Sequence, residues 1–399
     1  MRVHCDAQDR VALNSFFISH LEKLLSRKPV GSLTFKTVQP IMGKASHMKN
    51  TQMLIVDPQK PDLERIRVAA KLIVQGGLVA FPTETVYGLG ANALNPDAVL
   101  GLFKAKKRPL DNPPIVHVEN IQDVYKLSEY VPAKAEKLMR KFWPGPLTLI
   151  FQHSLMVPKV TVAGLDTVAI RMPKHNVALA LIRESGCPIA APSGNIAGRP
   201  SPTSAKHVFE DLNGRIDAIL DSGPTRIGVE STVLDMTVDP PVVLRPGGTP
   251  FETLKKMFDV RLHPFVVAEK VLSLSEVRSP GMRHKHYAPN ADVVVVEGAI
   301  PAVVTKVREI AASYRQKGAK VGILATDETQ TAYETDVVKS LGSRFNMDLV
   351  AKNLFSFLRE LDAAGVDVII AEGLSTEGLG LAVMNRLRKA SGYNIIKAG

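Results

Sequence analysis

Cationic side chains are concentrated in the segment 103–113, which reads FKAKKRPLDNP. Three lysines and one arginine occupy positions 104–108. Such a cluster suits one of three tasks: gripping nucleic acid, complementing the dipole at a helix C-terminus, or neutralising an anionic substrate. Asn95 followed by Pro96 predicts a helix start, because asparagine caps a helix and proline fits its first position, and Pro109 predicts the helix end.

Lys106 differs from its cationic neighbours by its place on this predicted helix. It continues an apolar stripe of residues three and four positions apart, which contains Val99, Leu102 and Phe103. An ammonium group turned inward needs an anion or a pocket to offset its desolvation. Lys104, Lys107 and Arg108 lie elsewhere around the helix. On this segment alone, a simple dipole role for all four charges stays open.

Polar side chains follow two short apolar runs. The run LVAFP leads into TETVYG, which brings in Thr83, and the run PIAAP leads into Ser193 and Asn195. Ligands of open α/β sheets bind beyond the carboxyl ends of strands, so these side chains are candidate ligand contacts. The alternative is a capped turn that satisfies its own backbone. Because PSGN is not a G-x-S-x-G elbow, we expect ligand hydrogen bonding rather than covalent catalysis.

Three further polar positions accompany strands. Arg171 lies in TVAIRM, Arg245 ends VVLR, and Ser231 follows Glu230 at the start of STVLDM. Each arginine is either a structural ion-pair partner or an anion contact, and the sequence leaves both open. Taken together, these clusters predict one polar, positively charged cleft. No protein-held metal is predicted, since the histidines and cysteines show no ligand spacing, and no P-loop is present, so scattered cations would neutralise any bound phosphates.

Two α/β domains are predicted to position these residues. The first, 53–265, has a helix at 62–77 and a large twisted mixed sheet, with strands at 78–82, 115–118, 147–151, 167–172, 188–192, 218–221, 231–236 and 242–245. The second, 291–399, has nearly continuous apolar runs at 292–298, 319–327 and 366–373, with helices at 302–318 and 349–365. Strands buried on both faces and alternating with helices indicate a small parallel three-layer, Rossmann-like domain. It lacks a G-x-G-x-x-G turn, so no dinucleotide site is inferred.

Bulk composition agrees with two globular domains. The chain has 399 residues, 45% of them hydrophobic and 22% charged. No apolar run approaches the roughly 18 to 20 residues that a membrane span needs. The net charge of +11 favours polyanionic partners without choosing among them. Two distant cysteines, Cys5 and Cys187, predict no disulfide framework and favour a cytoplasmic setting.

The first residues, 1–52, read as an N-terminal extension that is dispensable, because they show neither a strand pattern nor a secretory segment. We predict that deleting residues 1–47 leaves activity and thermal stability unchanged, since no periodic pattern ties them to a core. Thermal unfolding and rate measurements on both forms check this. A large fall in melting temperature would contradict it.

The combination of FPTETVYGLG, KAKKRPLDNP, TVAIRMP and APSGN resembles the YrdC-like superfamily, and specifically its threonylcarbamoyl-AMP synthases. This resemblance covers about residues 53–265. The segment PGMRHKHYAP within 266–290, together with the domain after it, resembles the linker and second domain of the long two-domain form. Hydrogenase-maturation carbamoyltransferases share the first fold but carry further domains that this sequence lacks.

The resemblance implies an enzyme that makes threonylcarbamoyl-AMP and pyrophosphate from L-threonine, bicarbonate or CO2, and ATP. ATP is expected as a substrate with Mg²⁺, with no permanent cofactor, and a downstream transferase would pass the product to tRNA. The resemblance places Lys106 and Arg108 among the substrate carboxylate and phosphates, both turned inward, and leaves Lys104 and Lys107 in solvent.

The remaining matched positions divide between the two substrates. The family's threonine contacts match Thr83, His117 and Arg171, helped by Arg108 and Ser193. Its nucleotide side matches Ser193 and Asn195, with weaker candidates in Ser231 and Arg245. Tyr287 and His286, in HKHYAP, are expected to close over the bound substrates as part of a lid, with Tyr287 at ATP. The alternative is a simple spacer between the two domains.

Two other functions are weighed against this one. A double-stranded RNA or tRNA-binding module without catalysis would explain the basic charge, but it would turn its cations outward. A carbamoyltransferase would use carbamoyl phosphate in place of bicarbonate. Pyrophosphate release that depends on threonine separates the synthase from both.

Overall fold

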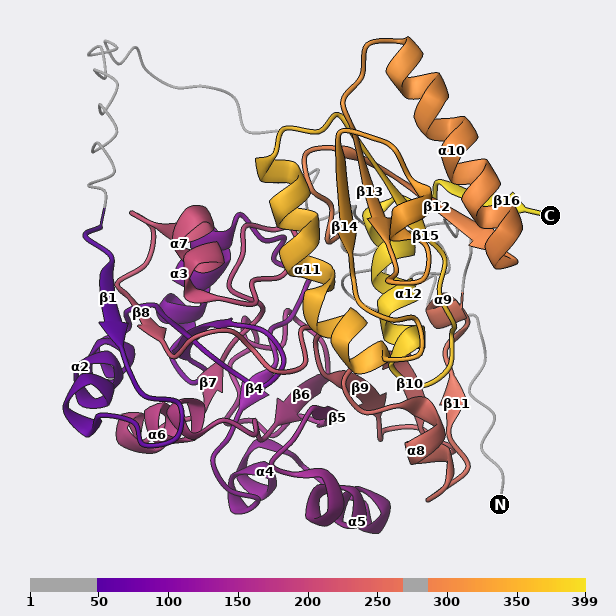
Figure 1. The fold of residues 1–399 in the computed structure, drawn as a ribbon. Coiled ribbons are helices and arrows are strands. Elements are labelled where there is room, and N and C mark those ends of the chain that lie inside the picture. The colour runs from indigo at the N-terminus through magenta and orange to yellow at the C-terminus, as the bar shows by residue number, and fades with distance from the viewer. Residues whose placement is uncertain (1–48, 268–285) are drawn as a thin grey trace, which may run out of the picture. The chain divides into compact units, whose positions relative to one another are not determined.

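A mixed sheet of eleven strands spans residues 52–262 of the computed structural model, which describes residues 49–267 and 286–399. Its strands are β1 (Gln52–Ile55), β2 (Val79–Phe81), β3 (Gly88–Asn92), β4 (Val116–His117), β5 (Leu147–Gln152), β6 (Thr167–Arg171), β7 (Ile189–Ala190), β8 (Ala218–Asp221), β9 (Thr232–Asp235), β10 (Val242–Arg245) and β11 (Arg261–Leu262). They lie in the order β1-β8-β2-β3-β7-β4-β6-β5-β9-β10-β11 (Figure 1). The sheet contains parallel pairs such as β1 with β8 and antiparallel pairs such as β5 with β6. The predicted large mixed sheet is confirmed, and its eight predicted strands are present within two residues of their expected ends.

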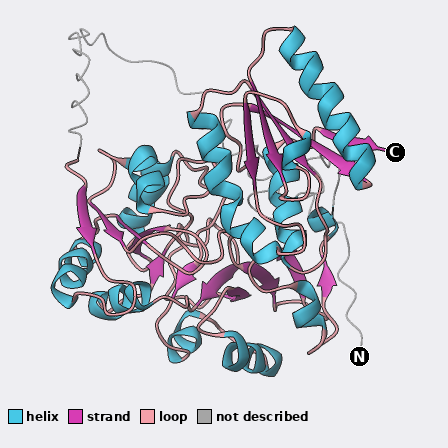
Figure 2. Ribbon diagram, in the orientation of Figure 1, coloured by secondary structure: helices cyan, strands magenta, loops and turns pink. Residues whose placement is uncertain are grey.

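Helices pack on both faces of this sheet near β1, β8, β2 and β3 (Figure 2). The helices of this region are α2 (Leu63–Val74), α3 (Pro96–Lys106), α4 (Gln122–Leu127), α5 (Ala133–Phe142), α6 (Asn176–Ser185), α7 (Ala205–Leu212), α8 (Phe251–Lys255) and α9 (Pro264–Val267). One face holds α2 and α6, which bury Ile66 and Leu181 against Val79. The other holds α3 and α7, which bury Leu102 and Val208 against Leu89. Residues alternate between the two faces because successive strand side chains point in opposite directions.

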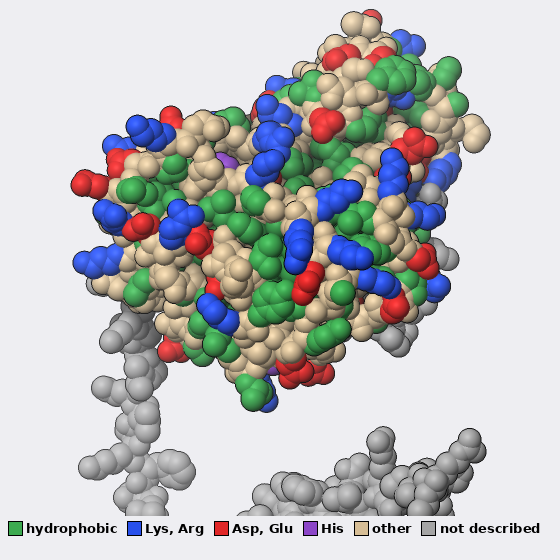
Figure 3. Space-filling model, turned by 90° about the horizontal axis from the view of Figure 1, so that it is seen from below, with side chains coloured by type: hydrophobic (Ala, Val, Ile, Leu, Met, Phe, Trp, Pro, Cys, Tyr) green, Lys and Arg blue, Asp and Glu red, His purple; other side chains and the backbone are tan. Residues whose placement is uncertain are grey.

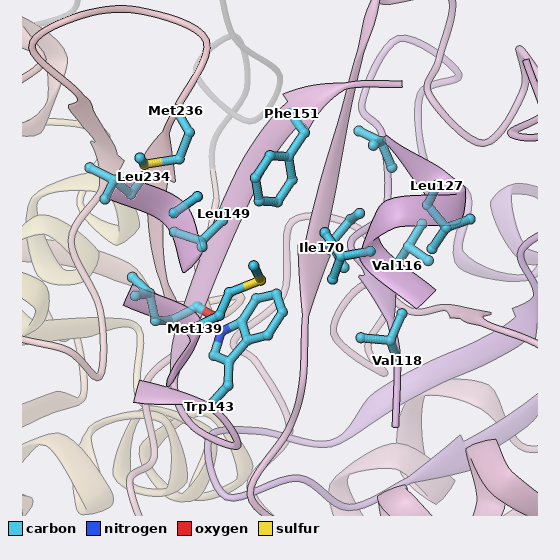
Figure 4. Close-up of a cluster of buried hydrophobic side chains, with 14 of the residues drawn as sticks. Val116, Val118, Leu127, Met139, Trp143, Leu149, Phe151, Ile170, Leu234 and Met236 are labelled. Carbon is cyan, nitrogen blue, oxygen red and sulfur yellow. Dashed lines mark hydrogen bonds between the residues drawn. The ribbon is translucent and has the colours of Figure 1, made fainter. Parts of the chain in front are cut away.

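A third apolar core lies on one face of β4, β6, β5 and β9 (Figure 4). Met139 and Trp143, from the end of α5, pack there with Leu149, Phe151 and Ile170. The indole of Trp143 donates a hydrogen bond to the carbonyl of Leu147, 2.7 Å away, so its polar atom is satisfied. Burying each large apolar side chain contributes roughly 1.5–3 kcal/mol. This core packs one face of these strands against the helices. Their opposite face remains available for other contacts.

The loop after β2 departs from expectation. It was predicted as a polar loop, but residues 83–87 are buried, and they lead into β3, which the sequence did not indicate. This strand has the sequence GLGAN. It was not predicted, because glycine is unfavourable in strands. Packing requires one of them: a Cβ at Gly90 would lie 2.8 Å from Cγ2 of Ile189 and 2.9 Å from Cε1 of Phe81.

Helix α3 begins as predicted and ends earlier than predicted. The Asn95 side chain accepts hydrogen bonds from the backbone of Asp97 and Ala98, which confirms the cap. The last helical residue is Lys106, not the residue before Pro109. Lys107 has a φ of 53°, a left-handed conformation that terminates the helix. Lys107 and Arg108 therefore lie beyond the helix rather than around it.

Residues 292–398 form a second sheet whose five strands are all parallel. Its strands are β12 (Asp292–Gly298), β13 (Val321–Ala325), β14 (Val337–Ser340), β15 (Val368–Glu372) and β16 (Ile395–Ala398), in the order β14-β13-β15-β12-β16. One face packs on α10 (Ile300–Gln316), and the other packs on α11 (Met347–Ala363) and α12 (Leu379–Ala390). A short 3₁₀ turn, η2 (Gln330–Ala332), precedes β14. The predicted parallel three-layer domain is confirmed, although β14 and β16 were not predicted.

Two buried arginines connect this second sheet's helices to the first region. Arg359 of α11 donates to Asp211, at 2.9 Å, and to the carbonyl of Pro200, at 2.6 Å. Arg386 of α12 pairs with Glu230 at 2.9 Å. Residues 1–48 of the predicted extension and residues 268–285 of the predicted linker, His284 and Lys285 included, lie outside the described residues. None of the helices in the described part of the chain combines the length and apolar character that crossing a membrane requires.

Candidate active site

A cavity of about 690 Å³ lies over the face of β5, β6 and β9 that faces away from the Trp143 core. Alternate residues of these strands form its floor: Ile150, Gln152, Thr167, Ala169, Arg171, Val233 and Asp235. The cavity thus adds a sheet face to the strand-end residues that the sequence marked, such as Thr83, Ser193 and Asn195. Because β5 is antiparallel to β6 and parallel to β9, the carboxyl ends of these strands do not share one edge. A cavity of this volume is within the range of small-molecule sites.

All ten residues that the sequence marked for the site line this one cavity. They are Thr83, Lys106, Arg108, His117, Arg171, Ser193, Asn195, Ser231, Arg245 and Tyr287. They come from separate loops and strands, so the fold collects cations that are far apart in the chain. The individual roles assigned to them stay predictions.

The Lys106 side chain is buried, as its stripe position predicted. Its ammonium donates hydrogen bonds to the backbone carbonyls of Ser193 and Asn195. Burial and the nearby Arg108 hold the pKa of Lys106 well below its ordinary value. Lys106 thus fixes the Ser193–Asn195 loop against α3 and brings a cation to the cavity wall. Lys104 and Lys107 are exposed, as expected.

Arg108 and Arg245 are two further cations in the cavity wall. Arg108 donates to the carbonyls of Asn112, at 2.8 Å, and Pro113, at 3.2 Å. Burial lowers the pKa of Arg108 to about 10, helped by the charge of Arg245. Arg245 donates to the carbonyl and the hydroxyl of Ser231, both at 3.1 Å. The hydrogen bonds that both donate within the described residues go to neutral oxygens, so both charges are available to a bound anion.

Arg171 is an ion-pair partner as well as a cavity residue. Its Nη2 lies 2.6 Å from Oε2 of Glu84, and its Nη1 donates to Oγ1 of Thr85 at 3.0 Å. The Glu84 contact is a charge contact without hydrogen-bond alignment. Of the two alternatives left open for this arginine, the structural ion pair is present. Glu84 thereby fixes the guanidinium at the end of β6, against the cavity.

Neutral hydrogen-bonding groups lie beside Arg171. The Thr83 hydroxyl accepts hydrogen bonds from the backbone of Thr85 and Val86, so the capped turn that was weighed for this loop is present. Burial, with the charge of Arg171, lowers the pKa of His117 to about 3. His117 is therefore uncharged at neutral pH and contributes a dipole and a hydrogen bond rather than a charge.

The loop after β7 presents a buried acceptor to the cavity. Asn195 donates from Nδ2 to the carbonyls of Ile196, at 2.8 Å, and Arg199, at 2.9 Å. Its Oδ1 is buried and has no hydrogen-bond partner in the described part of the chain. A buried acceptor without a donor costs free energy unless a ligand supplies one. A ligand that brought a donor to Oδ1 would offset this cost.

The linker and the second domain also contribute to the cavity wall: Tyr287 and His286 of the linker were expected near the substrates, whereas Lys389 of the second domain was not. The Tyr287 ring stacks on Phe355 of α11, with ring centres 5.4 Å apart, and lies 5.6 Å from the guanidinium carbon of Arg386. His286 and Lys389, at the end of α12, line the cavity too. Lys389 lies in RLRKA, where a cation at a helix C-terminus is ordinary, so nothing local marked it.

Comparisons with known proteins cover nearly all of the described chain. Residues 71–247 match a family model described as "Telomere recombination", the Sua5, YciO and YrdC family. Residues 250–392 match "Threonylcarbamoyl-AMP synthase, C-terminal domain". The threonylcarbamoyl-AMP synthase of Pyrococcus abyssi is 53% identical over 334 residues, which are 84% of this chain and 96% of that protein. The Bacillus subtilis protein of the same name is 49% identical, over 86% of this chain and 97% of its own.

A solved structure gives the same similarity in three dimensions. The crystal structure of P. abyssi Sua5 complexed with L-threonine matches with a TM-score of 0.82 and 51% identity. It covers 88% of this chain and all of the matched chain. Both relatives and this structure are matched across both domains, as the resemblance to the long two-domain form predicted.

Proposed function

The chain belongs to the threonylcarbamoyl-AMP synthase family, and we propose that it converts L-threonine, bicarbonate or CO2, and ATP to threonylcarbamoyl-AMP and pyrophosphate. The observation that carries this is the single cavity into which Lys106, Arg108, Arg171 and Arg245 converge from three separate segments. A site rich in cations and without an activated nucleophile suits a reaction in which the substrates supply the nucleophile.

The reaction needs no covalent bond to the protein. The amine of threonine and bicarbonate form a carbamate with loss of water. A carbamate oxygen then attacks the α-phosphorus of ATP, the bond from that phosphorus to the bridging oxygen breaks, and pyrophosphate leaves. What the protein supplies is orientation and neutralisation of the charge that develops on the phosphates.

The threonine end of the cavity is proposed to lie at Thr83, His117 and Arg171. The guanidinium of Arg171, fixed by Glu84, suits the carboxylate of an amino acid. Uncharged His117 suits a neutral amine or hydroxyl. The structure of the P. abyssi relative, which is complexed with L-threonine, supports a threonine site in this chain.

The nucleotide end is proposed to lie at Ser193, Asn195, Ser231 and Arg245. Lys106 and Arg108 would lie between the two ends, where the carbamate meets the α-phosphate. Among the described residues, no group of three or more His, Cys, Asp or Glu side chains is placed to hold a metal. The phosphates themselves would then carry most of the coordination of Mg²⁺.

The product is proposed to go to a transferase that acts on tRNA, and the reaction to take place in the cytoplasm. The alternative of an RNA-binding module without catalysis expected outward cations, whereas Lys106 is buried at a cavity. The face drawn in Figure 3 carries Lys and Arg side chains with acidic side chains between them. No observation in the structure favours this alternative over the enzyme.

Pyrophosphate release from ATP, measured with and without threonine and bicarbonate, tests the proposal. We expect release only when both are present, together with threonylcarbamoyl-AMP detected by chromatography. Release without threonine, or no release at all, would overturn the synthase assignment. Turnover with carbamoyl phosphate in place of bicarbonate would instead support a carbamoyltransferase.

Tyr287→Ala should lower the yield of threonylcarbamoyl-AMP more than it lowers affinity for ATP. Tyr287 lines the cavity and rests on Phe355, so its ring is placed to exclude water from the product. A mixed anhydride hydrolyses readily, and closed sites suppress such side reactions. Product yield and the Kd of a nonhydrolysable ATP analogue measure the two effects. Tyr125→Ala, at a half-exposed position on α4, is the control, and full product yield from the Tyr287 variant would refute the lid.

A further inference from the structure

Lys389, at the end of α12, is a cavity cation whose ammonium has no hydrogen-bond or ion-pair partner among the described residues. Of the other cavity cations, Lys106, Arg108, Arg171, Arg199 and Arg245 donate hydrogen bonds to protein oxygens, and Lys107 is exposed. The ammonium of Lys389 makes no hydrogen bond or ion pair within residues 49–267 and 286–399, although it lines the cavity. A half-buried ammonium that faces a cavity and lacks a carboxylate partner is suited to an anion supplied by a ligand.

The charged side chains around Lys389 carry a net positive charge. Three charged side chains act on it: Arg386 from the same helix, Arg245 from β10, and Glu230 from the loop before β9. Glu230 is already paired with Arg386 at 2.9 Å. The positive charges of Arg245 and Lys389 therefore remain for a bound polyanion. Burial, with the charges of Arg386 and Arg245, lowers the pKa of Lys389 to about 7.

The position of Lys389 indicates which part of the substrate it meets. The charged side chains that act on Lys389 are Arg386, Arg245 and Glu230. Arg171, where threonine is proposed, acts on Arg245 but is not among the charges that act on Lys389. In phosphoryl transfer the leaving group departs roughly in line with the attacking oxygen, on the opposite side of phosphorus. The carbamate would come from the Arg171 side, so pyrophosphate would leave away from it. Pyrophosphate also carries more negative charge than any other group in the reaction.

We propose that Lys389 binds the β- and γ-phosphates of ATP and the pyrophosphate that leaves, so that helix α12 of the second domain completes the nucleotide site. This proposal rests on the proposed function. It gives the second domain a direct part in the reaction, in addition to its contacts with Tyr287. Lys389 stabilises the negative charge that builds up on the leaving group as its bond to the α-phosphorus breaks.

The full chain with Lys389→Met or Lys389→Arg, titrated with magnesium pyrophosphate and with AMP, tests this. Methionine keeps the length of the side chain without its charge, and arginine keeps the charge. We expect Lys389→Met to bind pyrophosphate roughly tenfold to a hundredfold more weakly, and Lys389→Arg to bind it close to wild type. Affinity for AMP and for L-threonine should be unchanged. Lys306→Met, in an exposed ion pair on α10, is the control.

Measuring pyrophosphate affinity at several pH values adds a test whose result would not change if Lys389 had only a structural role. A polyanion favours the charged form of Lys389, so binding takes up a proton. Wild-type affinity for pyrophosphate should therefore fall, relative to Lys389→Arg, as pH rises from about 6 to about 9. The groups that face Lys389, namely Arg245, Arg386, Glu230 and the cavity residues His286 and Tyr287, are the same in both proteins. The titration of pyrophosphate itself is also common to both, so the comparison isolates Lys389.

The outcomes separate this inference from the proposed function. Wild-type affinity for pyrophosphate in Lys389→Met would overturn the role of Lys389, while threonine-dependent synthesis by the wild type would leave the function in place. Equal loss of pyrophosphate and AMP binding in both variants would show a structural role and would also overturn it. Absence of threonine-dependent pyrophosphate release from the wild type would instead reject the proposed function.

Discussion

Arg108→Met should lower the rate of threonine-dependent pyrophosphate release by about a hundredfold or more, the size expected when a preorganised electrostatic contact is lost. Arg108 lines the cavity, and its protein contacts are two backbone carbonyls, so its charge is available to the phosphates. The free energy of unfolding should change little, because the lost hydrogen bonds are offset by removing a buried charge beside Arg245. Steady-state rates and denaturant unfolding measure the two quantities.

Lys107→Met is the matched control for Arg108. Lys107 is the adjacent cation and also lines the cavity, but it is exposed and ends helix α3 in a left-handed conformation. Its loss should reduce the rate much less. Equal losses for the two variants would mean that the segment acts through its total charge, as an RNA-binding surface would, and not through one inward cation.

Arg386→Met should destabilise the protein by about 3–5 kcal/mol, because it leaves the carboxylate of Glu230 buried without its partner. Burial alone would raise the pKa of Glu230, but Arg386, Arg245 and Ser201 outweigh it and hold the pKa below its ordinary value. Without Arg386 this balance is lost. Product formation should fall too, since the guanidinium of Arg386 lies beside the ring of Tyr287. Denaturant unfolding of both proteins measures the loss of stability.

The double variant Arg386→Met, Glu230→Gln should recover part of this stability, because no buried carboxylate is left without Arg386. Arg183→Met serves as the comparison, since its partner is Glu119 at the surface and its side chain is 64% exposed. An exposed pair of this kind contributes roughly 0–1 kcal/mol. A loss in Arg386→Met as small as that in Arg183→Met would show that the buried pair does not hold α12 in place.

The local sequence pattern was enough to predict most helices and strands and the inward direction of Lys106. Val99, Leu102, Phe103 and Lys106 share one face through helical spacing alone, and that face is buried. Strand β9 was read from β-branched residues and strand β12 from a continuous apolar run, because such residues suit a buried pleated surface. The motifs that resemble the family marked ten residues, which all line one cavity. Strand β3 was not predicted, because its glycines suit close packing against Phe81 and have low strand propensity.

Partners distant in sequence could be known only from the folded chain. Lys106 bonds to a carbonyl 87 residues away, and Arg386 pairs with a carboxylate 156 residues away. Neither separation leaves a local signal, because nothing in the residues near one partner depends on the other. The same holds for Arg171, whose ion pair with Glu84 joins a strand to the loop after β2. Lys389 reads as an ordinary cation at a helix end until the packing of α12 places it at the cavity, since burial and neighbouring charge arise only when distant segments meet.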